Sequence, residues 1–332
     1  MTQTPNERTE DPEVSVIIPA YRAAKYIKTA LDSVFAQTFA GNEVISIEVV
    51  VINDGSPDTD ELDRIISQAP GPVVYIKQGN KGPAAARNAG IKAARGRFIA
   101  FLDSDDYWLP NYLSEQLAVF QADPPVDLVY ADALLTENPL LAGRTFMSLT
   151  PSSGEADLEA LLTARCTIIL SGTVVRRNRM VEAGLFDERF SHSEDYDLWL
   201  RLAVAGARLA YQKKVLLIRR ELATGLCGNP VNLLRCQIRV LIKLLRAGGL
   251  TSHQRALARE RIHQTRAAIR LEQARGCFGR GEFMRAAKAI QSANRVMHST
   301  RLRMIAFGLR SFPHLLLRLH SCRHLCTRVK LT

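Results

Sequence analysis

Apolar runs and amphipathic stretches alternate along the first part of the chain. Short continuous apolar runs, which are typical of strands buried on both faces, occupy residues 14–19, 47–52, 73–76 and 98–102. Apolar residues at helical spacing predict helices at residues 23–37, 84–94 and 111–121. Strands that alternate with helices in this way predict an α/β fold, with a doubly wound, mainly parallel sheet and right-handed crossovers.

The alternation becomes weaker after residue 121 but continues to about residue 221, where we place the end of the first domain. We predict strands at residues 127–131, 168–176, 208–211 and 215–219, and helices at 158–164, 178–183 and 194–205. Residues 134–151 carry no clear period, so we expect a loop or excursion there.

The last third of the chain is predicted to be helical, at residues 231–247, 253–276 and 282–297. Residues 301–320 then alternate apolar residues with arginines around Pro313. This pattern is typical of a basic helix on a membrane surface, and equally of a helix that packs its apolar side on the domain. The expected divisions are a disordered N-terminal segment (1–13), an α/β domain (14–221), a helical region (222–300) and a basic amphipathic tail (301–332).

Charge is spread unevenly over the 332 residues, whose formal net charge is +11. From residue 231 onward there are 21 Lys and Arg against three Asp and Glu, a net of +18, which leaves −7 for the rest. Such asymmetry indicates two regions with different partners. Because arginines of the tail alternate with Leu, Ile and Phe, rather than with stacking aromatic residues and glycine, we expect an anionic membrane surface as a partner and no nucleic acid.

The sequence carries no recognisable targeting or spanning segment. Its start, MTQTPNERTEDPE, lacks the apolar core of a signal peptide, and no run of 18 apolar residues occurs. The six cysteines form no CxxC pair, so neither a disulfide framework nor a zinc ribbon is indicated. We expect a cytoplasmic protein, peripheral on the cytoplasmic face of the membrane if the tail binds lipid.

Three acids follow the apolar run at residues 98–102, in the stretch FIAFLDSDDYW. Asp103 and Asp105 leave the predicted strand at its carboxyl end, where open α/β sheets bind ligands. Hard cations such as Mg²⁺ and Mn²⁺ take oxygen ligands of this kind and share them with the phosphates of a substrate. The alternative is a solvated acidic turn before the next helix, with Asp106 near its first turn.

Two other strand ends carry polar residues. Asp54 follows the second strand, where it can accept hydrogen bonds from a base or ribose, and Gly55 allows close approach of the backbone. Arg87 lies near the start of a helix entered through residues 81–83, and an arginine at a helix N-terminus favours a phosphate. Taken singly, these residues are more often an ordinary turn and a surface arginine. Because carboxyl ends of parallel strands meet at one edge, we expect all three clusters to share one crevice.

A fourth cluster lies at the start of the predicted helix 194–205. If Asp195 lies on the side of the sugar opposite to the leaving phosphate, it could take a proton from an attacking hydroxyl. Glu194, His192 and Trp199 are the candidates for the acceptor side of the site. Acids at a helix start also complement the helix dipole, which is the alternative interpretation.

In this order and at these intervals, the segments VSVIIPAYRAAKYI, VVVINDGSPD, NKGPAAARNAGI, FIAFLDSDDYW and HSEDYDLWLRL resemble glycosyltransferase family 2. The resemblance covers residues 14–221. It implies the GT-A fold, which is Rossmann-like, followed here by a C-terminal helical extension. It also implies a nucleotide-diphosphate sugar as donor and inversion at the anomeric carbon.

The resemblance implies a role for each matching residue. It implies a metal-binding DxD motif at Asp103 and Asp105 for Mn²⁺ or Mg²⁺, and Asp195 as the catalytic base. The nucleotide-sugar contacts that it implies are Pro19, Tyr21, Asp54, Arg87 and Asp103. Many relatives have Asp-Asp-Gly where this chain has Asn53-Asp54-Gly55, a change that keeps the second acid.

We therefore expect a transferase that moves a single sugar from a UDP-sugar to a saccharide or lipid-linked saccharide in cell-surface polysaccharide or glycolipid synthesis. A processive synthase would add a QxxRW-type motif and spanning helices, and the sequence has neither. The alternative is a GT-A-like protein that binds a nucleotide or glycan without turnover.

Overall fold

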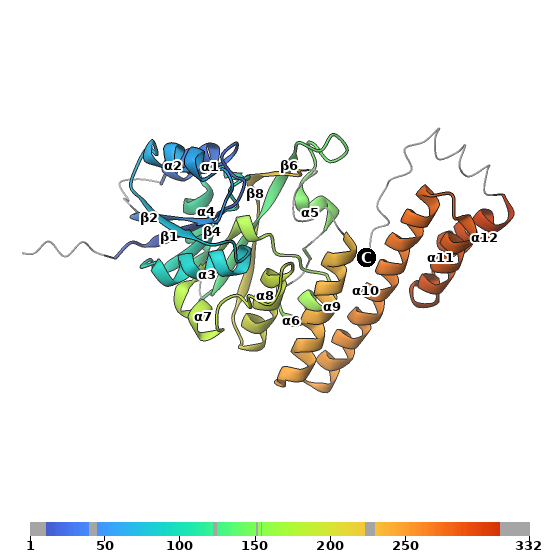
Figure 1. The fold of residues 1–332 in the computed structure, drawn as a ribbon. Coiled ribbons are helices and arrows are strands. Elements are labelled where there is room, and N and C mark those ends of the chain that lie inside the picture. The colour runs from blue at the N-terminus through green and yellow to red at the C-terminus, as the bar shows by residue number, and fades with distance from the viewer. Residues whose placement is uncertain are drawn as a thin grey trace, which may run out of the picture. The chain divides into compact units, whose positions relative to one another are not determined.

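The computed structural model describes residues 11–39, 45–121, 125–150, 152–153, 155–222 and 230–312. The chain divides into two compact units. The sheet unit comprises Met1–Asp157 and Cys166–Leu222, and the helical unit comprises Leu158–Arg165 and Ala223–Thr332. Figure 1 shows the strands in the blue-to-yellow part of the chain and the long helices in orange and red.

One eight-stranded sheet forms the centre of the sheet unit, in the order β3-β2-β1-β4-β7-β6-β8-β5. Its strands are β1 (Val14–Ala20), β2 (Ile47–Asp54), β3 (Val73–Gln78), β4 (Phe98–Phe101), β5 (Tyr107–Trp108), β6 (Leu128–Thr136), β7 (Thr173–Arg176) and β8 (Leu209–Arg220). Strands β1 to β4 are mutually parallel, whereas β7 is antiparallel to β4 and β6, and β5 is antiparallel to β8. The expected α/β fold with a mainly parallel sheet is therefore confirmed.

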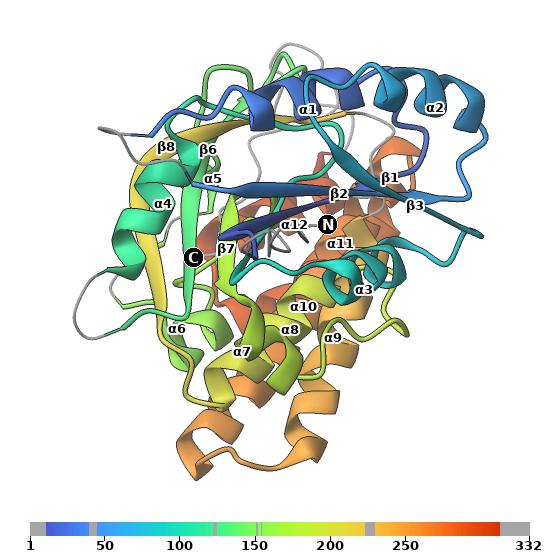
Figure 2. The same cartoon turned by 90° about the vertical axis from the view of Figure 1, so that its left-hand side faces the viewer.

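Helices cover both faces of this sheet, and Figure 2 shows α1 and α2 on the side opposite to α3, α7 and α8. The helices of the unit are α1 (Ile27–Phe35), α2 (Thr59–Ser67), α3 (Pro83–Ala93), α4 (Tyr112–Phe120), α5 (Phe146–Leu149), α7 (Arg177–Glu182) and α8 (Glu194–Val204). Alternate strand residues point to opposite faces, so Val16 and Ile18 join the core beneath α1, α2 and α4. Ile17 faces α3, where a Cβ on Gly90 would lie 2.8 Å from its Cγ2 atom.

The sequence predicted most of these elements, but three expectations were wrong in detail. Predicted strand 168–176 begins as a 3-10 turn, η1 (Leu170–Gly172), and only its second half is strand β7. The two closing strands expected at 208–211 and 215–219 are one strand, β8, with a register shift against β6. Helix α2 was not predicted, because only Leu62 and Ile66 of its nine residues are buried apolar positions.

The helical unit consists, in its described part, of α6 (Leu158–Leu162), α9 (Pro230–Ala247), α10 (Ser252–Gly279), α11 (Phe283–Met297) and α12 (Thr300–Ser311). The predicted helices 231–247, 253–276 and 282–297 are confirmed. Helix α10 begins with a capping box between Thr251 and Gln254, which satisfies two backbone N–H groups at its start. Helix α11 packs against both α10 and α12 (Figure 1), around a core of Ala274, Ala286, Ala287, Ile290, Leu302, Ala306 and Leu309.

The structure describes only part of the predicted N-terminal segment (1–13) and of the predicted basic tail (301–332). Of the segment 1–13, residues 1–10 lie outside the described residues, and the backbone N–H of Glu13 donates to the carbonyl of Ser46 at 3.0 Å. Of the tail, residues 301–311 belong to α12, whose apolar side packs on its neighbours, and residues 313–332 lie outside the described residues. Among the helices that the structure describes, none combines the length and the apolar character needed to cross a membrane.

Candidate active site

The polar clusters at the ends of β1, β2 and β4 lie at one edge of the sheet because these strands are parallel neighbours. Ala20 at the end of β1 pairs with Asn53 near the end of β2, and β4 lies on the other side of β1. The turn after β4 carries Asp103 and Asp105. The sequence expectation of a shared strand edge therefore matches the sheet order, and this edge is where open α/β sheets bind ligands.

Asp54 ties the end of β2 to the loop that enters α3. Its carboxylate is buried and accepts hydrogen bonds from the Gln78 Nε2 atom at 2.7 Å and from the backbone N–H groups of Lys81 at 2.9 Å and Gly82 at 2.8 Å. Gly55, with a φ of 64°, lies so close to this loop that a Cβ would be 2.5 Å from the Asn80 backbone nitrogen. Asp54 thus holds the loop in place, and its expected contact with a nucleotide stays a prediction.

Arg87 is the central cation of the site. It is only 5% exposed, and its guanidinium donates from Nη1 to Glu194 Oε1 at 2.7 Å and from Nη2 to Asp103 Oδ1 at 2.8 Å. Although burial opposes the charge, Asp103 and then Glu194 raise the pKa of Arg87. This side chain therefore joins the acids after β4 to the start of α8, two segments that lie far apart in the sequence. The Nε atom of Arg87 has no hydrogen-bond partner among the described residues.

The three acids after β4 are in different electrostatic states. Burial opposes ionisation of Asp103, but Arg87 outweighs it and lowers the pKa of Asp103, whose side chain is still 37% exposed. Burial, and then the charge on Asp103, raise the pKa of Asp105 to about 6. Asp106 is buried and accepts a hydrogen bond from the backbone N–H of Arg220 at 3.0 Å. Asp105 is thus a carboxylate without enough positive charge nearby to hold its pKa down.

Asp195 lies within the electrostatic range of the same group. Burial, and then the charge on Glu194, raise the pKa of Asp195 to about 7, with a further rise from Asp103 and an opposing effect of Arg87. Its Oδ1 atom accepts a hydrogen bond from the backbone N–H of Tyr196 at 2.7 Å. Ser193, the residue before α8, has a φ of 62°, an uncommon conformation for a residue other than glycine. Ser193 therefore takes this left-handed conformation directly before α8, which begins at Glu194 and has Asp195 as its second residue.

The chemistry of these carboxylates fits a divalent cation. Asp103 and Asp105 supply hard oxygen donors, and a bound cation would offset the burial and the charge of Asp103 that raise the pKa of Asp105. No group of three or more His, Cys, Asp or Glu side chains suited to a metal occurs among the described residues. Asp103 and Asp105 are the carboxylates of this turn that would hold Mn²⁺ or Mg²⁺.

The other predicted residues differ in how accessible they are. Tyr21, after β1, is exposed, and the Arg22 guanidinium lies 5.5 Å from the centroid of its ring. Pro19 is partly exposed at the end of β1, and His192 is partly exposed with its Nδ1 atom 3.1 Å from the Ser191 hydroxyl. Trp199 is only 1% exposed. Its indole Nε1 atom has no hydrogen-bond partner among the described residues, and its expected place on the acceptor side stays a prediction.

Sequence analysis missed several residues that touch the acids. Arg220, at the end of β8, donates from Nη1 to the Asp105 carbonyl at 2.6 Å, and Arg219 contributes to lowering the pKa of Asp103 and of Asp105. The Ser171 hydroxyl accepts from the backbone N–H of Asp103 at 3.2 Å. The sequence does show two adjacent arginines, Arg219 and Arg220, at the end of a predicted strand. Because they lie more than 100 residues after Asp105, the sequence alone did not indicate that they lie near it.

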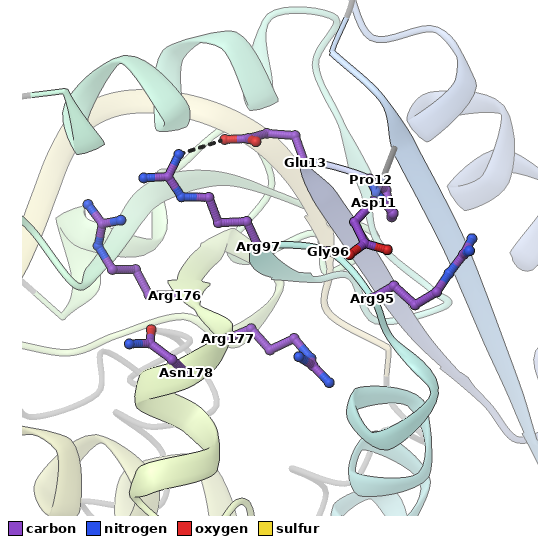
Figure 3. Close-up of a pocket in the computed structure, with 9 residues that line it drawn as sticks. All are labelled: Asp11, Pro12, Glu13, Arg95, Gly96, Arg97, Arg176, Arg177 and Asn178. Atoms are coloured by element: carbon purple, nitrogen blue, oxygen red, sulfur yellow. Dashed lines mark ion pairs between the residues drawn. The ribbon is translucent and has the colours of Figure 1, made fainter. Parts of the chain in front are cut away.

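A separate hollow of about 470 Å³ lies at the opposite edge of the sheet. Figure 3 shows its lining, in which Arg97 points toward Glu13 and is joined to it by an ion pair of 3.5 Å. Its residues precede β1 and β4 and follow β7, and are Asp11, Pro12, Glu13, Arg95, Gly96, Arg97, Arg176, Arg177 and Asn178. Strand β4 separates this hollow from Asp103, so it is not part of the candidate active site.

Comparison with known proteins identifies the family of this chain. The profile of Glycosyl transferase family 2 matches residues 15–138, and that of Glycosyl transferase family group 2 matches residues 98–226. The UDP-Glc:alpha-D-GlcNAc-diphosphoundecaprenol beta-1,3-glucosyltransferase WfaP of Escherichia coli is 30% identical over 245 residues, which cover 74% of this chain and 90% of WfaP. The chain belongs to glycosyl transferase family 2. The resemblance seen in the sequence is thereby confirmed.

Solved structures of similar fold include other glycosyltransferases. S. aureus TarS 1–349 in complex with UDP-GlcNAc has a TM-score of 0.61 at 19% identity and covers 95% of this chain and 93% of its own. Mannosyltransferase PcManGT from Pyrobaculum calidifontis, in complex with GDP-Man and Mn²⁺, has a TM-score of 0.61 at 18% identity, with coverages of 94% and 85%. At these identities the likeness establishes the fold alone, and the expected GT-A fold is confirmed.

The family 2 chain also matches longer proteins over only part of their length. It spans between 29% and 31% of three uncharacterized glycosyltransferases from Rickettsia felis, R. conorii and R. bellii, at 29% to 30% identity, while 57% to 63% of this chain is matched.

Proposed function

We propose that this chain is an inverting glycosyltransferase that moves a single sugar from a nucleotide-diphosphate sugar to a hydroxyl of its acceptor. The observation that carries the proposal is the bridge made by Arg87, which contacts Asp103 on one side and Glu194, the neighbour of Asp195, on the other. The bridge thereby connects Asp103, whose pKa is lowered, with the start of α8, where the residue after Glu194 is Asp195, with a pKa of about 7. A direct displacement needs these two kinds of acid on opposite sides of the reacting sugar.

In this proposal Asp105 and Asp103 hold Mn²⁺ or Mg²⁺. When bound, the cation balances the charge that grows on the departing nucleoside diphosphate, an effect worth several kcal/mol. Arg87 keeps Asp103 ionised and oriented, and Arg220 fixes the backbone carbonyl of Asp105. Asp54 and Gly55 hold the loop that we propose to lie beside the nucleotide, with Pro19 and Tyr21 on the same edge.

Asp195 acts as the general base and takes the proton of the acceptor hydroxyl. A base with a pKa of about 7 matches neutral pH, where its ionised form is present and still basic enough to accept a proton. General-base assistance of this kind contributes roughly 10² to 10⁴-fold to the rate. Glu194 and His192 lie beside it on the side from which we propose the acceptor enters.

The relatives guide the proposed substrates. WfaP is named for UDP-Glc and a diphosphoundecaprenol-linked acceptor, and TarS was solved with UDP-GlcNAc. We therefore propose a UDP-sugar as donor and a saccharide or lipid-linked saccharide as acceptor, in cell-surface polysaccharide or glycolipid synthesis. A lipid-linked acceptor would place the reaction at the cytoplasmic face of a membrane, with the enzyme bound there peripherally.

The test is release of UDP from UDP-sugars with Mn²⁺, stimulated by an acceptor. Asp195→Asn is expected to keep nucleotide binding and lose most transfer, whereas Asp105→Ala also weakens the Mn²⁺-dependent part of binding. Asp60→Asn, on the exposed surface of α2, is the matched control and should behave as the parent. If Asp195→Asn transfers at the parental rate, the base is another group.

The same assay separates the alternative, a protein that binds a nucleotide or glycan without turnover. Such a protein would be stabilised by UDP but would release no UDP from any UDP-sugar in the presence of Mn²⁺ and acceptors. The raised pKa of Asp195 favours catalysis, because strongly shifted carboxylate pKa values concentrate at catalytic sites.

A further inference from the structure

Helix α12 has two different faces. Leu302, Ala306 and Leu309 are buried and pack with residues of α11. Met304 and Phe307, which project from another side, are 67% and 64% exposed. Because they are three positions apart, they lie next to each other on the helix surface, and Phe312 just beyond the helix is 59% exposed as well. We call Met304, Phe307 and Phe312 the α12 apolar face.

This face is a local concentration of exposed apolar side chains. The described residues include eight large apolar side chains that are exposed, and three of them fall within the nine positions from Met304 to Phe312. Apolar residues scattered singly over a surface are ordinary, whereas a contiguous group marks a contact with a protein or a membrane. Met304 and Phe307, which are neighbours on the helix surface, make the α12 apolar face a group of the second kind, and Phe312 extends it along the chain.

The charge around the face is entirely positive. Arg301, Arg303 and Arg310 are exposed on the same helix. Neither Asp nor Glu occurs anywhere after Glu282 in the sequence, and within the described residues no ion pair involves these three arginines. The helical unit from residue 230 to 312 contains 17 Lys and Arg and three acids. A partner for this face must therefore offer an apolar layer and negative charge together.

We propose that the α12 apolar face docks this protein on an anionic lipid bilayer. A polyanion in water would leave Met304 and Phe307 exposed, and an apolar protein groove would leave the arginines without counter-charges. At a bilayer surface the apolar side chains enter the acyl boundary while arginines reach the lipid phosphates from their flexible stems. The inference deepens the membrane location in the proposed function, and it is independent of whether sugar transfer occurs.

The experiment is co-sedimentation of the full chain with vesicles of phosphatidylcholine, with or without phosphatidylglycerol. The Met304→Ser/Phe307→Ser variant removes the apolar contacts and keeps the charge, and should weaken binding to the anionic vesicles about tenfold or more. The Arg303→Gln/Arg310→Gln variant keeps the apolar contacts and should weaken it by about fivefold for each charge removed.

The matched controls carry equivalent changes elsewhere on the surface. Leu140→Ser/Val181→Ser alters two exposed apolar residues of the sheet unit, and Lys92→Gln/Lys213→Gln removes two exposed charges there; both should pellet as the parent does. Asp195→Asn should also pellet as the parent does, which separates docking from catalysis.

Four results would overturn the proposal. One is binding to anionic vesicles that Met304→Ser/Phe307→Ser leaves unchanged, and a second is the absence of such binding in the parent chain. Another is a lower unfolding midpoint of that variant without vesicles, which would mean that the chain itself covers the face. The last is a change in its mass by light scattering, which would mean that a second copy does.

Discussion

At the scale of single residues, the buried guanidinium of Arg87 decides how the acids of the site behave. Removing an arginine from water is costly, and two charge-assisted hydrogen bonds to Glu194 and Asp103 offset that cost. The same contacts lower the pKa of Asp103, while the pKa of Asp105 and of Asp195 is raised by burial and by neighbouring acids. Arg87 thus keeps Asp103 ionised, while burial and the neighbouring acids determine the higher pKa of the other two carboxylates.

Arg87→Met should lower the free energy of unfolding by about 3–5 kcal/mol, because it leaves Glu194 buried without its partner. The loss of unfolding free energy should lie at the lower end of this range, because Asp103 is 37% exposed and can be hydrated when Arg87 is removed. Urea unfolding measures the change. Arg64→Met, which removes an exposed pair with Glu61 on α2, should leave the unfolding midpoint unchanged. Equal effects of the two substitutions would contradict the bridging role.

Asp195→Asn should stabilise the metal-free protein at neutral pH. The ordinary pKa of an aspartate is about 3.9, and the folded protein raises that of Asp195 to about 7. Between these values the folded chain binds a proton that the unfolded chain has released, so the stability contribution of Asp195 falls as pH rises from about 4 to 7. The stability difference between Asp195→Asn and the parent should therefore grow over this window and level off above it. Urea unfolding at several pH values, without metal or nucleotide, measures it; a pH-independent difference would contradict the raised pKa.

At the scale of elements, the turn after β2 and the loop before α3 form one structure. Asp54 is bonded to both the end of β3 and the two backbone N–H groups before Pro83, which begins α3. Gly55 allows the two segments to approach, because it has no Cβ and tolerates a positive φ. Three motifs that are separate in sequence therefore depend on one another for their positions.

Gly55→Ala should destabilise the protein by about 1–2 kcal/mol from the left-handed backbone alone, and further because its Cβ would meet the Asn80 nitrogen at 2.5 Å. It should also weaken UDP binding by moving the loop. Gly79→Ala, on the same loop, has no atom within 4 Å of the added Cβ and should leave stability unchanged or slightly raised. Thermal unfolding and UDP titration test the pair. A tolerated Gly55→Ala would show that the loop is not held against the turn.

At the scale of the whole molecule, the two compact units carry different charges and different kinds of surface. The acids of the site lie in the sheet unit, whereas the excess of basic over acidic residues and the α12 apolar face lie in the helical unit. Such a division is what a transferase acting on a lipid-linked acceptor would use, with chemistry in one unit and membrane attachment in the other.

UDP with Mn²⁺ should raise the thermal midpoint of the full chain more than UDP alone, and more than GDP with Mn²⁺. At a concentration one hundred times the dissociation constant, a ligand adds about 2.7 kcal/mol of stability. In Asp105→Ala, the additional rise of the thermal midpoint that Mn²⁺ causes should be lost, and the smaller rise with UDP alone should remain. A larger shift with GDP would exclude UDP as the nucleotide of the donor.

The sequence alone determined the succession of elements and the family. Buried strands and amphipathic helices are encoded by local periods, and the family motifs are short and contiguous, so both can be found without knowledge of distant contacts. The acids after β4 and at the start of α8 were found in the same way. Helix α2 was missed because few of its positions are apolar.

Only the tertiary structure decided which side chains meet. Glu194 as the partner of Arg87, Arg220 beside Asp105 and the burial of Trp199 join segments or faces whose pairing depends on how the sheet and helices pack. The pKa order of the acids also follows from that packing, because burial and neighbouring charges are properties of the folded state. Likewise, the arginine pattern of the tail allowed both a packed and a lipid-facing helix, and the fold gives α12 a packed face and an exposed one.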